Sequence, residues 1–376
     1  MLSRVIQALP FSILVFFISH FLPLSSKTTN NLFYVGIALP GLVFLLLQTK
    51  ETTKTLVRKL LLPLLLLAFI IASSAESIGD MKLVIYLFLF AVALNASKND
   101  KNFAQKGMWL ASLASIAVLI AITLHWVLLS IQSGASIRYG QLMGMEINPV
   151  HLALLMATSV GYLWIFHLDS RLQQRGTLAF SMGLSIFVAT ALLITLIFQA
   201  RSALVGLGLF FAAYIYQRKN SPWLISGLIG AVIIAIFSLG ADDILANRGL
   251  SYRPLIWEDA LRRLMDDCDI LWGCGKDDYL FAGQFPHPHS GYVSVFYQSG
   301  ALGALAFIIF AGIFFFKSLR DGCRWLPIAL IGWGALLTTS NGMFTSPSHP
   351  LWIYFWLPTI MCLIESRRST SALPIR

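Results

Sequence analysis

The composition of the chain indicates a membrane protein. Of its 376 residues, 57% are hydrophobic and only 12% are charged, whereas soluble domains carry roughly 25% charged residues. The mean hydropathy of +0.76 fits a chain that is largely surrounded by lipid. These values exclude an ordinary water-soluble domain.

Apolar windows along the chain predict about twelve transmembrane helices, because a helix needs about 20 residues to cross a bilayer. We expect an all-α polytopic fold with helices 1–9 in residues 1–240, one long hydrophilic loop at 241–290, and helices 10–12 with a tail in 291–376. Too little chain remains for a separate soluble catalytic domain, so an active site must be built from helix ends and loops. The windows are 6–23, 31–48, 59–74, 82–96, 107–130, 149–168, 178–198, 202–217, 222–240, 291–316, 325–340 and 350–365.

The distribution of charge predicts the topology. With a cytoplasmic amino terminus, 18 of the 27 Lys and Arg residues fall in cytoplasmic segments, which is the positive-inside pattern, with both termini inside. Arg4 precedes the first helix, which lacks a small-residue cleavage site and is predicted to be retained. The long loop then faces outward and carries five basic and nine acidic residues, a net charge of −4. The overall charge of +10 therefore predicts no nucleic-acid partner.

Arg201 is the first unusual outward residue, since it lies between two apolar windows that almost touch. A cation near hydrocarbon is costly, by roughly 2.5–3.5 kcal/mol at the bilayer centre and less at the interface. An outward arginine here predicts an anionic partner. The alternative is a side chain that reaches lipid headgroups.

Arg253 is the second unusual outward residue and lies directly before Pro254. The stretch from Pro254 predicts an amphipathic helix near the membrane, because proline suits a first turn and Leu255, Trp257, Leu261 and Leu264 are spaced for one apolar face. A guanidinium at a helix start suits phosphate. The alternative is a salt bridge to a nearby acid. Exposed pairs of that kind are expected of Arg262 and Arg263.

His287 and His289 come directly before the tenth window, in Pro286-His287-Pro288-His289-Ser290-Gly291. An imidazole with an ordinary pKa near 6.5 exchanges protons at neutral pH, which suits a general base. Two metal ligands are an alternative, but zinc needs three or four and no further His or Cys completes a cluster. Interfacial histidines that cap a helix are the third interpretation. The other histidines, His20, His125, His151, His167 and His349, stand singly in the sequence and predict packed or interfacial roles.

Three further outward features are weaker. Arg138 is expected to add positive charge to the same face, and Asn148-Pro149 is expected to open the sixth helix. Cys268 and Cys274 lie in the outward loop, where an oxidising compartment permits a disulfide. Two free thiols remain the alternative.

Outward arginines and a histidine at a membrane surface together predict a lipid-linked anionic substrate. In glycosyl transfer from a polyprenyl diphosphate, the leaving diphosphate gains charge that arginines can stabilise in place of a metal. A sugar hydroxyl is a poor nucleophile, and a histidine base is worth about 10²–10⁴ in rate. This chemistry names neither the sugar nor the atom that is attacked.

The second half of the chain resembles the O-antigen ligase family. The motifs appear in family order: Arg201 before a helix, Arg253 followed by Trp257, the turn Trp272-Gly273-Cys274-Gly275, and His289 with Gly300 eleven residues later. The family usually has Asn after this histidine, whereas this chain has Ser290, which leaves the neighbour's role in doubt. The first half, with Arg138 and Asn148, matches only loosely.

The resemblance implies a metal-independent, inverting glycosyltransferase with a GT-C-like fold and no cofactor. It would move O-antigen polysaccharide from undecaprenyl diphosphate to lipid A–core, at the periplasmic face of a bacterial inner membrane. Arg201 and Arg253, with Arg138 in support, would bind the diphosphate, and His289 would be the base. His287, Ser290 and Trp257 would support the site, and His287 is a rival for the base.

Two other functions stay open. An O-antigen polymerase uses a similar fold and donor but extends lipid-linked repeats, whereas a protein O-oligosaccharyltransferase usually has an extra periplasmic domain. A lipid or polysaccharide transporter would carry ionisable residues inside its helices. The predicted helices here are nearly free of them, which favours a one-sided enzyme.

Overall fold

A computed structural model gives the structure of residues 2–22, 24–48, 50–74, 78–98, 107–134, 137–142, 145–218, 222–237, 252–338 and 343–365. The described chain is helical, apart from a hairpin of two-residue strands, β1 (Gln141–Leu142) and β2 (Met145–Glu146). The prediction of an all-α fold missed this small hairpin. The first six helices are α1 (Leu2–Ser19), α2 (Ser26–Phe33), α3 (Leu39–Leu47), α4 (Lys50–Ser74), α5 (Lys82–Lys98) and α6 (Met108–Ser133).

The remaining helices follow the predicted windows closely. Two pairs are continued through short π-helical turns, η1 (Tyr34–Ala38) between α2 and α3, and η4 (Trp164–Leu168) between α7 and α8, while η6 (Trp352–Trp356) leads into the last helix. The helices are α7 (Pro149–Leu163), α8 (Asp169–Gln174), α9 (Thr177–Phe198), α10 (Arg201–Gln217), α11 (Pro222–Ile236), α13 (Arg253–Asp266), α14 (Gly291–Arg320), α15 (Leu326–Leu336) and α16 (Leu357–Ile364).

The chain is a multi-pass membrane protein by the length and composition of its helices. Six helical stretches in the described residues are long and apolar enough to cross a bilayer: Ser26–Leu47, Thr53–Ser74, Met108–Ser133, Pro149–Gln174, Thr177–Phe198 and Gly291–Arg320. Five shorter apolar helices accompany them. Each predicted window thus contains helix, but a count of twelve crossings stays a prediction.

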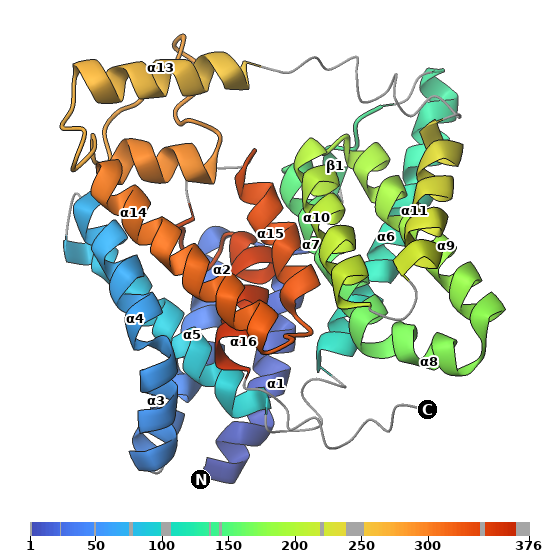
Figure 1. The fold of residues 1–376 in the computed structure, drawn as a ribbon, viewed down its shortest axis with the longest axis horizontal. Helices are drawn as coiled ribbons and strands as arrows, with labels where there is room; N and C mark the ends of the chain where they lie inside the picture. Colours follow the sequence, from blue (N-terminus) through green and yellow to red (C-terminus); the bar gives the residue numbers. More distant parts are fainter. Residues whose placement is uncertain are drawn as a thin grey trace.

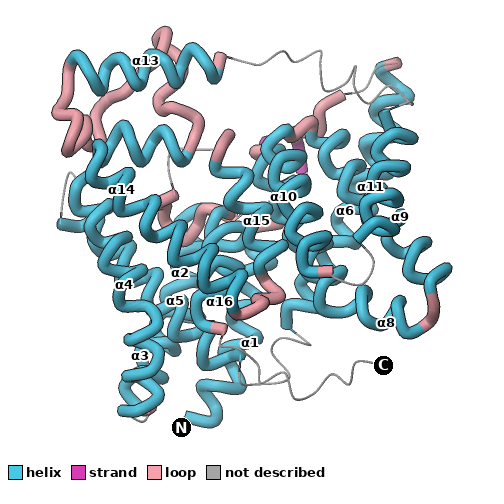
Figure 2. The backbone as a smooth tube through the Cα atoms, viewed as in Figure 1, coloured by secondary structure: helices cyan, strands magenta, loops and turns pink. Residues whose placement is uncertain are grey.

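The helix α13 lies across one end of the bundle, far from the amino end of α1 (Figure 1). We call this end the α13 side. Loops connect α13 to the start of α14 there (Figure 2). The part of the predicted loop at 241–251 lies outside the described residues.

A small core of its own holds α13 on the bundle. Ile256, Ala260 and Leu264 recur at helical spacing and pack with Tyr279 and Tyr297. The predicted helix is therefore present and begins at Arg253, and Leu264 of its predicted apolar face is buried in this core. Leu255 is exposed, because the helix packs on the following loop and on α14 through the neighbouring stripe.

The helix α14 is broken at Gly300, where φ is 62° and ψ is −163°. The turn at 270–275 fills the break: Ala301 N–H donates to Ile270 O at 2.9 Å, and Cys274 N–H donates to Tyr297 O at 2.8 Å. A Cβ at Gly300 would lie 2.4 Å from the Leu271 carbonyl group. The glycine is needed both for its backbone angle and for this close approach.

The helices α10 and α15 also approach very closely. A Cβ at Gly206 would lie 2.5 Å from Ile331 O, and one at Gly334 would lie 2.9 Å from Gly206 Cα. Small residues allow such backbone contact between membrane helices. The start of α10, with Arg201, is thereby fixed beside the end of α15.

Candidate functional site

The segment 285–290 presents two histidines in a fixed turn at the start of α14. His289 has a positive φ of 54°, which is uncommon and is concentrated at functional sites. Its backbone N–H donates to Nδ1 of His287 at 3.3 Å, and the two ring centroids are 3.9 Å apart. Ser290 is buried and caps α14, since its hydroxyl accepts from Val293 N–H at 3.4 Å.

The imidazole rings of His287 and His289 differ in the hydrogen bonding of their nitrogen atoms. Because Nδ1 of His287 accepts a hydrogen bond, a neutral His287 carries its proton on Nε2 and is a donor there. Nε2 of His289 is buried and has no hydrogen-bond partner in the part of the chain that is described. Burial, followed by the charges of His287 and Arg253, lowers the pKa of His289 to about 4. His289 is therefore neutral near pH 7.

The start of α13 lies against this turn. Trp257 donates from its indole nitrogen to Pro288 O at 3.0 Å. Arg253 is one helical turn earlier and half-buried, and its charge acts on His289. The predicted spacing of Arg253 and Trp257 thus has a structural reason, because one helix face brings both residues to the histidine turn.

Arg201 and the histidine turn both flank the end of α15. Ser202 Oγ lies 2.6 Å from Thr338 Oγ1, and Tyr292 donates its hydroxyl to Trp333 O at 2.6 Å. A Cβ at Gly291 would lie 2.9 Å from Leu336 Cδ2. Arg201, the first residue of α10, is thus brought to the same side of the molecule as the start of α14.

Arg138 contacts the chain just before Arg201. Its Nε donates to Phe198 O at 3.1 Å, directly before the turn that leads into α10. It also lines a cavity of about 480 Å³ with His125 and Glu146. Asn148 caps α7 as predicted, since its Oδ1 accepts from Val150 N–H at 3.1 Å. Arg138 therefore supports the α9–α10 turn that carries Arg201.

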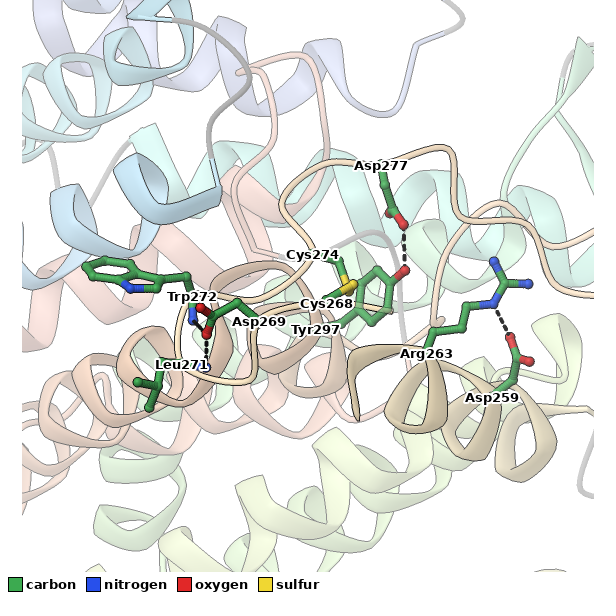
Figure 3. Close-up of a disulfide and its surroundings, with 9 residues drawn as sticks. All are labelled: Asp259, Arg263, Cys268, Asp269, Leu271, Trp272, Cys274, Asp277 and Tyr297. Carbon is green, nitrogen blue, oxygen red and sulfur yellow. Dashed lines mark hydrogen bonds and ion pairs between the residues drawn. A yellow bond between two sulfur atoms is a disulfide. The ribbon is translucent and has the colours of Figure 1, made fainter. Parts of the chain in front are cut away.

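The segment 268–277 belongs to the loop that the sequence predicts to face outward, and for that reason we call it the outward turn. A disulfide between Cys268 and Cys274 closes it (Figure 3). Within it, Asp269 Oδ1 accepts from Leu271 N–H at 2.8 Å. Tyr297 of α14 donates to Asp277 Oδ2 at 2.6 Å. The structure thus selects the disulfide over two free thiols.

Ion pairs brace the same region. Asp259 accepts from both Arg262, at 2.9 Å, and Arg263, at 3.0 Å, so these arginines form pairs as predicted. Lys276 Nζ lies 2.8 Å from Asp80 Oδ2 and connects the outward turn to the α4–α5 connection. This second pair has no signal in the sequence, because about two hundred residues separate its members.

Three of the histidines that stand singly in the sequence lie close together in the structure, which agrees with the predicted packed roles. The rings of His151 and His349 are 4.5 Å apart, and His20 Nε2 lies 3.3 Å from Pro347 O. The spacing along the chain gave no signal for this cluster. Across the described residues, no group of three His, Cys, Asp or Glu side chains is arranged to hold a metal ion.

The fold and the site define a multi-pass membrane protein with basic and imidazole groups gathered at one end of its helices. The chain is 26% identical over 361 residues to a protein named O-antigen ligase from Pseudomonas aeruginosa. The alignment covers 88% of this chain and 83% of the relative. No protein-family model matches the chain, and no solved structure matches it. The relative confirms the resemblance to the O-antigen ligase family.

Proposed function

We propose that this chain is a glycosyltransferase of the O-antigen ligase type. It transfers O-antigen polysaccharide from undecaprenyl diphosphate to a sugar hydroxyl of lipid A–core. The observation that carries this proposal is the state of the His289 side chain in its turn. Its buried Nε2 has no hydrogen-bond partner among the described residues, and burial, followed by the charges of His287 and Arg253, lowers the pKa of its ring. A base without a partner beside an arginine suits the activation of a hydroxyl next to a phosphate.

In the proposed reaction, the acceptor oxygen attacks the anomeric carbon of the donor sugar as its proton passes to Nε2 of His289. The bond from that carbon to the diphosphate oxygen breaks, with inversion. The leaving undecaprenyl diphosphate gains negative charge, which Arg253 and Arg201 stabilise, with Arg138 in support. A guanidinium grips two phosphate oxygens at once. No metal or cofactor takes part in this scheme.

His287 positions the base in this scheme. Its Nδ1 holds the backbone of His289 in its positive-φ conformation, and an imidazole occupied in this way is a poorer base at that atom. Trp257 holds the same turn through Pro288. Ser290 caps α14 by its own hydroxyl, a role that asparagine also fills at helix starts.

We further propose that both termini are cytoplasmic and that the α13 side is periplasmic, in a bacterial inner membrane with a GT-C-like arrangement of helices. The basic residues of the predicted cytoplasmic segments support this orientation. The Cys268–Cys274 disulfide supports it too, because the periplasm is oxidising.

The test is a gel of lipopolysaccharide, with an assay of undecaprenyl-linked glycan, from cells whose only copy carries His289→Ala. We expect bare lipid A–core and long polymer that remains on the lipid carrier. Lipid A–core capped by a single repeat would instead identify a polymerase. An unchanged ladder would remove His289 from the mechanism, and loss of glycan transport with normal transfer would indicate a transporter.

A further inference from the structure

A cavity of about 370 Å³ lies on the α13 side, between the ends of α4 and α14 and the segments 276–288 and 343–345. His287 is on its wall, and the centroid of its ring is 3.9 Å from that of the His289 ring. We propose that this cavity binds the acceptor sugar, as a subsite for an uncharged, hydroxyl-rich carbohydrate. This inference rests on the proposed function. The volume is within the range of about 300–1,000 Å³ that is usual for small-molecule sites.

The polar groups on the wall suit sugar hydroxyls. The Thr345 hydroxyl is buried and has no partner among the described residues, and the Gln298 amide forms no side-chain hydrogen bond within them. His287 offers its Nε2–H, and Asp277 keeps one carboxylate oxygen beyond the one that Tyr297 occupies. These donors and acceptors are mixed, as hydroxyl groups require, because a hydroxyl both donates and accepts.

The charge of the wall argues against the donor diphosphate as the occupant. Lys276 is the basic residue on the described wall, and it is paired with Asp80 at 2.8 Å. Asp277 adds a negative charge. No arginine of the described chain lines this cavity, whereas Arg138 lines the cavity of about 480 Å³ described above. A dianionic group would therefore be held poorly here.

The neighbouring surface suits an acceptor that is anchored in a membrane. The helices α4 and α14, whose ends enclose the cavity, carry exposed apolar side chains along their length. Tyr279 and Phe344 add aromatic faces to the wall beside its polar groups, and apolar surface combined with placed polar groups is usual for ligand sites. A lipid held along these helices would bring its attached sugars to the level of His289. The exposed side chains are Leu61, Leu62, Leu65, Phe69, Leu305 and Ile308.

The experiment measures kinetics with the purified full-length protein, undecaprenyl-diphosphate-linked O-antigen as donor, and lipid A–core from ligase-deficient cells as acceptor. We expect Gln298→Ala and the nearly isosteric Thr345→Val each to raise KM for the acceptor by about three- to tenfold, since each removes about one hydrogen bond. KM for the donor should stay within about twofold. Gln284→Ala, on the exposed loop outside the cavity, is the matched control.

A second measurement needs no turnover. Gln298→Cys places a thiol on the cavity wall, while Cys268 and Cys274 are bonded and Cys323 and Cys362 are buried. Lipid A–core should slow its reaction with a maleimide, and undecaprenyl phosphate should not.

Each other outcome overturns the inference. An unchanged acceptor KM in both variants, with no protection of the thiol, would remove the acceptor from this cavity while the proposed function stands. A raised donor KM would assign the cavity to the donor. A wild-type protein that does not transfer to lipid A–core at all would refute the proposed function itself.

Discussion

The two halves of the candidate site are built in different ways. The histidine half is braced by a disulfide, by ion pairs of Asp259 and Lys276, and by the turn that fills the break in α14. The Arg201 half is a single turn between α9 and α10, held by Arg138 and by close contact of α10 with α15. The difference fits the proposed chemistry, because a base must be placed within hydrogen-bond reach of one proton, whereas a phosphate accepts several arrangements of a guanidinium.

A change in the backbone of the histidine half should therefore cause a large loss of transfer activity. In Gly300→Ala, a Cβ would meet the Leu271 carbonyl at 2.4 Å from a backbone with positive φ, at a cost of at least about 2 kcal/mol. We expect transfer to fall by about 100-fold or more, as misplacement by about 1 Å can do. Gly312→Ala, in the same helix and with open space around its Cβ position, should keep wild-type activity and thermal stability. Equal activity of the two variants would refute the importance of the break.

The two arginines proposed to bind the diphosphate, Arg253 beside the histidine turn and Arg201 before α10, should respond to chemistry rather than to backbone strain. Arg253→Lys and Arg201→Lys should each lower kcat by about 10- to 100-fold, since loss of a preorganised donor costs about 10²–10³ and lysine keeps the charge without the fork. The folded state should be unaffected. Arg262→Lys, an exposed residue paired with Asp259, is the control. Full activity of both site variants would count strongly against a role in binding the diphosphate.

Removing the disulfide tests whether the bracing of the outward turn serves stability or catalysis. Cys268→Ser with Cys274→Ser should lower the free energy of unfolding of the outward segment by about 2 kcal/mol, as expected for a short closed loop. The rate should change only severalfold, because the hydrogen bonds to Tyr297 and Ile270 remain. Thermal unfolding in detergent, with and without a reductant, measures the first effect. The bracing role would be contradicted if the reductant did not change the thermal unfolding of the wild-type protein and the double variant were as stable as the wild type.

The sequence predicted the helices and the start of α13 well, because long apolar windows and Pro254 are local signals. The pair of Arg253 and Trp257 was visible only as a motif of the family, and its structural reason is that residues four apart share a helix face. The sequence did not predict which residues of α13 pack on the rest of the chain, because the choice between Leu255 and Ile256 depends on the loop beneath them.

Contacts between distant segments were beyond sequence reasoning. The fit of Gly273 against Gly300, the pair of Lys276 with Asp80, and the meeting of His151 with His349 join residues that share no local pattern. Gly300 was visible only as a family spacing, and its physical role is to break α14. Such positions are fixed by packing of whole helices, so one chain without its fold does not reveal them.

The smallest expected effect concerns the electrostatic link between Arg253 and His289. Burial, His287 and the positive charge of Arg253 lower the pKa of His289 to about 4, so the neutral base is fully present above this pH and is lost as the pH falls through it. Arg253→Gln removes one of these charges and should raise the pKa of His289, moving the acid limb of kcat/KM to higher pH. The ratio of rates at pH 5 and pH 7 should fall, by at most about tenfold, because one pKa unit corresponds to a factor of about ten. Arg262→Gln should leave this ratio unchanged. The same acid limb in wild type and Arg253→Gln would show that Arg253 does not influence the protonation of His289, and would leave burial and His287 as the causes that keep His289 neutral.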